Sequence, residues 1–153
     1  MGDIVLGRVV RAVERFSGDQ RLSDAPTRTS RWVPWPAELS SLEPADAEQA
    51  GRSLVDLDVR VGPYRFLRPE LSIESLEELA IALFRNYLAD PRLAIECRPD
   101  AVRFHWADPD ERGPAFHALL DGMAKRLTEL ARVEVGEWSV ERTPLTRSLV
   151  GRL

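Results

Sequence analysis

Two aspartates separated by one residue are the first candidates for chemistry in this sequence. Asp56 and Asp58 lie in SLVDLDVRV, residues 53–61, where every second residue is apolar. Paired carboxylates can hold two divalent ions that clamp the attacking and leaving oxygens of a phosphoryl transfer. The same alternation is typical of a strand with one face in solvent. Because the chain has no glycine-rich phosphate loop and places arginines on the same predicted face, we expect a solvated strand face and no metal site.

The histidines and the cysteine offer little further chemistry. His105 and His117 are the only histidines and fall on different predicted elements, so a histidine-based metal cluster lacks ligands. His105 could titrate near neutral pH but is expected to be a solvated strand position. His117, Asp121 and Lys125 form an i, i+4, i+8 row, typical of an exposed helical stripe. Cys97 is the sole cysteine, and its apolar alternation predicts a core thiol. We expect no catalytic residue and no cofactor.

The segment RWVPWPAEL is the strongest candidate for binding. Trp32 and Trp35 stand beside Pro34 and Pro36 in a stretch without periodicity, which predicts a stiff extended arm carrying two large apolar side chains. Those rings must be buried somewhere. They dock either on the parent domain or in a partner's pocket, where large aromatic residues dominate binding energy.

The elements that position these residues can be predicted from periodicity. Apolar residues at helical spacing predict a first helix ending near Gly18. Residues 19–53 show no period, apart from one short helix from Pro44 to Ala50 that Gly51 should stop. Residues 53–61 alternate as a strand, and 72–90 form an amphipathic helix behind Ser72 as N-cap.

A hairpin with its turn at Pro99 and Asp100 covers residues 93–106, followed by a helix that Gly113 and Pro114 open. A strand within 133–143 and an irregular tail complete the chain. The order strand, helix, hairpin, helix, strand predicts a ferredoxin-like α+β fold, βαββαβ, with two helices on one face of an antiparallel sheet. We divide the chain into an N-terminal helix and arm (1–52), the ferredoxin-like domain (53–143) and a C-terminal tail (144–153).

The sheet face away from the helices is predicted to be polar. Its residues are Asp56, Asp58, Arg60, Glu96, Arg98, Arg103, His105, Glu137, Ser139 and Glu141. RNA-binding sheets stack bases on aromatic residues, and this face has none. Its candidate binding residues are Asp56, Asp58, Glu96, Arg103, His105 and Glu137.

Composition narrows the class of protein further. The chain has 153 residues, 44% hydrophobic and 30% charged, with a net charge of −4, as in ordinary globular domains. A mildly acidic chain lacks the basic surplus of a nucleic-acid binder. No apolar run is long enough for a membrane span, and no secretory signal is evident, so we expect a cytoplasmic protein.

These observations favour a non-catalytic protein–protein interaction or assembly module, such as a subunit, an adaptor or an inhibitor-like protein, acting on a protein partner or by self-association. Two alternatives stay open. One is a small-molecule-binding enzyme that uses the open sheet face. The other is a metal-dependent phosphoryl-transfer enzyme that uses Asp56 and Asp58.

Overall fold

The computed structural model describes residues 4–17, 32–35, 42–60, 73–90, 92–107 and 113–153. Within them, helices and strands follow each other as β1 (Ile4–Leu6), α1 (Gly7–Ser17), β2 (Trp32–Pro34), α2 (Pro44–Arg60), α3 (Ile73–Tyr87), β3 (Leu93–Cys97), β4 (Ala101–Ala107), α4 (Pro114–Leu130), β5 (Glu137–Arg142) and β6 (Thr146–Arg152). The mixed α+β class predicted from the sequence is therefore confirmed. None of the described helices is long and apolar enough to cross a membrane.

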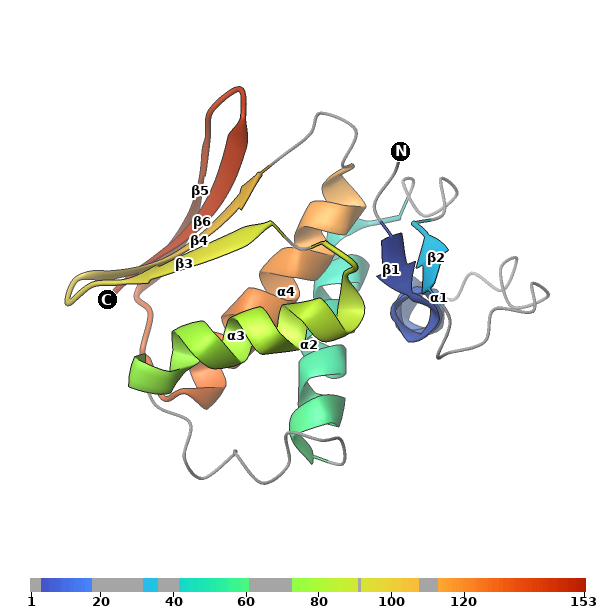
Figure 1. Cartoon of the computed structure of the whole chain (residues 1–153), viewed down its shortest axis with the longest axis horizontal. Coiled ribbons are helices and arrows are strands. Elements are labelled where there is room, and N and C mark those ends of the chain that lie inside the picture. The colour runs from blue at the N-terminus through green and yellow to red at the C-terminus, as the bar shows by residue number, and fades with distance from the viewer. Residues whose placement is uncertain (1–3, 18–31, 36–41, 61–72, 91, 108–112) are drawn as a thin grey trace.

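The main sheet has four antiparallel strands in the order β3-β4-β6-β5. Helices α3 and α4 lie on one face of this sheet, and its other face is uncovered by the helices (Figure 1). On the far side of these helices lie α2, then α1 with the short β1–β2 sheet. Alternation along β4 explains the layering, because Val102, Phe104 and Trp106 are buried against the helices while Arg103 and His105 face outward.

The strand predicted over residues 53–61 is wrong, because residues 53–60 belong to helix α2. The segment also fits a helical face: Leu54, Val55 and Val59 are buried, whereas Leu57 is exposed. Alternating valine and leucine residues satisfy both periods over so short a run, and tertiary packing decides between them.

The sequence predicted that Gly51 ends a helix, and this prediction is wrong. Gly51 lies inside α2 and allows α2 to pack closely on α4. A Cβ atom at Gly51 would lie 2.2 Å from the backbone oxygen of Leu119, and one at Gly122 would lie 2.1 Å from the backbone oxygen of Glu48. Helices α2 and α4 thus cross with their backbones in contact, which only glycine permits at these two positions.

The ferredoxin-like order is consequently not found, since its first strand is absent from the sheet. The place beside β4 is taken by β6, formed from residues expected to be an irregular tail. Leu149 and Val150 are buried there. The tail becomes a strand because Thr143 and Thr146 close a tight turn that folds it back between β4 and β5.

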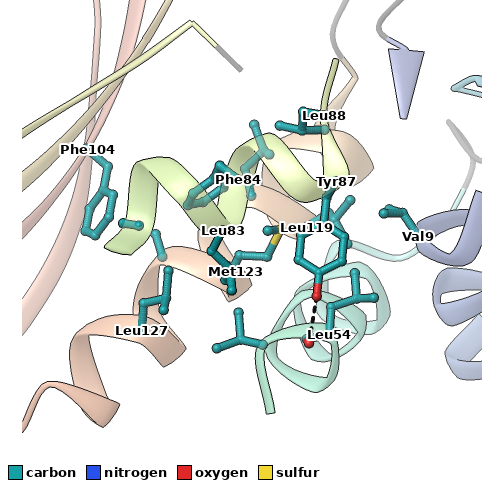
Figure 2. Packing of buried hydrophobic residues seen from close by; sticks show 14 of the residues in the cluster. Val9, Leu54, Leu83, Phe84, Tyr87, Leu88, Phe104, Leu119, Met123 and Leu127 are labelled. Atoms are coloured by element: carbon teal, nitrogen blue, oxygen red, sulfur yellow. Dashed lines mark hydrogen bonds between the residues drawn. The ribbon is translucent and has the colours of Figure 1, made fainter. Parts of the chain in front are cut away.

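The main hydrophobic core of the described residues extends from Val5 in β1 to Leu149 in β6. Figure 2 shows its centre, where side chains of α2, α3 and α4 meet Phe104 of the sheet. The Tyr87 hydroxyl donates a hydrogen bond to the backbone oxygen of Leu54, 3.1 Å away, so its polar end is satisfied inside the core. The predicted helix over 72–90 and the hairpin over 93–106 are confirmed by α3, β3 and β4.

Candidate functional site

The two aspartates that opened the sequence analysis lie on a helix. Asp56 accepts a hydrogen bond from Arg126 Nε at 2.7 Å, which ties α2 to α4. The placement of the Asp58 side chain lies outside the described residues. Among the described residues, no group of three histidine, cysteine or acidic side chains is placed to hold a metal ion.

Arg126 extends into a small ion-pair network. Glu129 accepts hydrogen bonds from Arg126 at 3.1 Å and from Arg52 at 2.8 Å. Partial burial raises the pKa of the Glu129 carboxyl, but these two arginines outweigh that effect and leave the pKa below its ordinary value. The network therefore links α2 to α4.

The outer sheet face carries Glu96, Arg103, His105 and Glu137, as the sequence predicted for these four. Arg103 donates to Glu141 at 2.8 Å across the sheet. His105 Nδ1 lies 2.7 Å from Ser148 Oγ, and its Nε2 lies 3.7 Å from a Glu96 oxygen. The hydrogen bond from Arg98 lowers the pKa of Glu96.

This row of glutamate, histidine and serine has the residue types of a hydrolytic triad but not its access. Ser148 is buried, whereas a nucleophile must reach its substrate. The contacts instead tie β3, β4 and β6 together across an open surface.

The two tryptophans of the arm occupy different environments. Trp35 is half-buried and packs edge-to-face on Phe116 of α4, with ring centroids 5.0 Å apart. Trp32 lies in β2 opposite Leu6 of β1, and 46% of its surface is exposed. Pro34 is also exposed, while Pro36 lies outside the described residues. Trp35 therefore belongs to the packing of this chain, and Trp32 presents its ring to solvent.

An open cavity of about 400 Å³ lies between the first turns of α4 and the β5–β6 hairpin. It is lined by Pro44, Pro114, His117, Ala118, Asp121, Arg142 and Arg147. Arg142 and Arg147 face each other across the hairpin, on the side of the sheet turned toward α4. Residues far apart in the sequence, from Pro44 to Arg147, thus meet at this cavity.

Arg147 and Asp121 form a bidentate pair at one side of the cavity. Arg147 Nη1 and Nη2 donate to the two Asp121 oxygens at 2.7 and 2.6 Å. Their side chains are only 6% and 13% exposed, and Arg147 Nε is buried with no hydrogen-bond partner among the described residues. A buried pair of this geometry is well fixed, and it cancels the negative charge of Asp121.

Arg142 and His117 form the opposite side. Arg142 Nη2 lies 2.9 Å from His117 Nδ1. Because a guanidinium group can only donate, Nδ1 of His117 is the acceptor in this contact. His117 is buried, so the imidazole ring holds the Arg142 head group in a defined place.

Two helix starts also meet at the cavity. Pro44 begins α2 and Pro114 begins α4, and both residues line the wall. The N-cap of α4, Gly113, makes no side-chain hydrogen bond to the first turn, and that turn carries no acidic residue. The N-terminus of a helix carries roughly half a positive charge. Among the lining residues that the structure describes, two arginines stand against one aspartate, while the first turn of α2 carries Asp46.

Sequence reasoning noticed part of this site but misjudged its surroundings. The row His117, Asp121 and Lys125 was expected to be an exposed stripe. In the structure His117 is buried, and Lys125 binds Glu48 of α2 at 2.8 Å. The row faces α2 and the β5–β6 hairpin, whose positions no local pattern encodes.

Comparison with known proteins gives one informative result. No protein-family model matches the chain, and no curated protein matches it. The crystal structure of an oxygen-binding H-NOX domain related to soluble guanylate cyclases, in its oxygen complex, resembles it with a TM-score of 0.51. The alignment covers 95% of this chain and 90% of that one at 14% sequence identity, so the likeness concerns the fold.

Proposed function

We propose that this domain is a non-catalytic binding module for a small anionic molecule, held in the cavity between α4 and the β5–β6 hairpin. The observation that carries the proposal is the charge of the cavity wall. Two arginines, Arg142 and Arg147, line the wall beside one described carboxylate, Asp121, which Arg147 binds, and the start of α4, whose first turn carries no acidic residue, lies next to them.

The size and rigidity of the cavity fit this role. About 400 Å³ is within the usual range of small-molecule sites, roughly 300–1,000 Å³. Carboxylate and phosphate groups are the ligands that guanidinium groups bind best. His117 fixes that guanidinium before the ligand arrives, which reduces the entropy lost on binding.

The H-NOX domain that resembles this chain supports the proposal that this fold can bind a small ligand. That H-NOX domain binds oxygen. The two histidines of this chain contact other side chains, His105 that of Ser148 and His117 that of Arg142. We extend to this chain only ligand binding in general, and not the identity of the neighbour's ligand.

The proposal is tested by the melting temperature in inorganic phosphate, sulfate and acetate, each against chloride at matched ionic strength. A ligand that binds the folded state stabilises it by RT ln(1 + [L]/Kd), which is about 1.4 kcal/mol at ten times Kd. Arg142→Gln should abolish the shift, since it removes the guanidinium group and leaves a polar side chain at an exposed position; urea unfolding verifies that the variant is folded.

Arg103→Gln is the matched control, because it removes an arginine of the outer sheet face. It should keep the shift. Absence of any anion-specific stabilisation, or an equal shift in Arg142→Gln, would contradict the proposal.

A protein-binding role, the first expectation from the sequence, is a second proposal, and the exposed Trp32 ring favours it. Large exposed aromatic rings are over-represented as interface anchors. If Trp32 anchors another copy of this chain, Trp32→Ala should lower the average mass measured by sedimentation at high protein concentration. An unchanged mass distribution would argue against self-association through this ring.

A further inference from the structure

We propose that the open edge of β5 pairs with β5 of a second copy of this chain, antiparallel and with the two-fold axis at Val140. Within the part of the chain that the structure describes, strand β5 is an edge of the main sheet and is bonded to β6 on one side only. Its sequence EWSVER contains no proline, and its three charged residues, Glu137, Glu141 and Arg142, disfavour those registers that place like charges opposite each other.

The turn after β5 fixes which backbone groups face this open edge. Thr143 N donates to Thr146 O at 2.9 Å, so Thr143 points its backbone groups toward β6. Backbone donors and acceptors alternate in direction along a strand. Trp138, Val140 and Arg142 therefore present their N–H and C=O groups outward, where another strand can bind them.

The register of the two β5 strands is selected by two requirements, one on the faces of the sheet and one on charge. Residues that lie opposite each other must point to the same face of the joined sheet, which holds only when the two-fold axis passes through a residue and not between two residues. With the axis at Val140, Trp138 faces the partner's Arg142, and the outward groups match in three hydrogen-bonded pairs. The two neighbouring registers are disfavoured because they place like charges opposite each other. With the axis at Ser139, Glu137 lies opposite the partner's Glu141, and with the axis at Glu141, the two copies of Glu141 lie opposite each other.

Burial favours the same register. Val140 is 47% exposed although it lies on the face of the sheet turned toward the helices. In the pair it packs on the partner's Val140. Arg142 takes part through its backbone, so this pairing is independent of the anion site.

Disulfide trapping tests the register directly. In a hydrogen-bonded antiparallel pair the Cα atoms are about 5.5 Å apart, within the range of a disulfide. With Cys97 replaced by serine, Val140→Cys should form a covalent dimer under mild oxidation. Ser139→Cys is the matched control, because its copies would lie about 8 Å apart and should form at least ten-fold less dimer.

Sedimentation of the full chain gives a second, non-covalent readout. A single strand pair buries less surface than a stable interface, so the dimer should appear only at high concentration. Val140→Pro should abolish it, since the lost N–H points outward and the bonds to β6 are kept. Urea unfolding verifies that this variant is folded. Equal trapping of both cysteine variants, or a wild-type chain that stays monomeric at every concentration, would overturn the proposal.

Discussion

Replacing Gly51 with alanine tests the closest contact in the structure, the crossing of α2 and α4. In a solvent-exposed helix this change stabilises by about 1 kcal/mol, because alanine is the better helix former. At the crossing, the new Cβ would lie 2.2 Å from the backbone oxygen of Leu119. Backbone cannot move aside as a side chain does, so the helices must separate by about 1 Å.

Separating α2 from α4 weakens the van der Waals contacts along their whole interface. A gap of about 1 Å forfeits up to half of the dispersion energy of each contact that it opens. Overpacking a core costs typically about 1–3 kcal/mol, and more where the obstacle is rigid. After the gain in helix propensity, we expect Gly51→Ala to lower the free energy of unfolding by roughly 2 kcal/mol.

Urea unfolding followed by far-ultraviolet circular dichroism measures this change. Gly136→Ala is the control, because a Cβ there would meet only Arg152 O at 3.6 Å, an ordinary contact, and stability should change by less than about 0.5 kcal/mol. Gly122→Ala should cost as much as Gly51→Ala, and the double variant less than the sum, since the first alanine already parts the helices. A neutral or stabilising Gly51→Ala would refute the close crossing.

Three further predictions concern other parts of the molecule. Trp35→Ala should lower the free energy of unfolding by about 2 kcal/mol through loss of the ring contact with Phe116, whereas Trp32→Ala should change it by less than about 0.5 kcal/mol in the same urea titration. Burial raises the pKa of the half-buried Cys97 thiol, so a thiol reagent should label it more slowly in the native protein than in urea at neutral pH; equal rates would contradict its placement. The lowered pKa of Glu129 contributes stability that is present above the ordinary value of 4.5 and lost as pH falls through the folded-state pKa, so unfolding measured from pH 6 to 3 should show a weaker acid dependence in Glu129→Gln.

The sequence determined the elements whose periodicity is long or unambiguous. The apolar stripe of α3 and the alternation through β3 and β4 each admit one regular structure, so these elements and the inward side of the hairpin were predicted correctly. The outward positions of Arg103 and His105 followed from the same alternation. The local pattern of apolar and polar residues was sufficient to predict these elements because each of them buries only one face.

Tertiary structure decided the remainder, and Gly51 shows why. A glycine in a helical pattern is a stop signal locally, but it becomes a contact point once another helix presents its backbone there. The short run of valine, leucine and aspartate after it fits a strand as well as a helix, and its packing against α4 selects the helix. The cavity has the same origin. His117 and Asp121 lie on a helix that the sequence predicted, but Arg142 and Arg147 reach them only because β6 inserts between β4 and β5, a long-range pairing that no local pattern specifies.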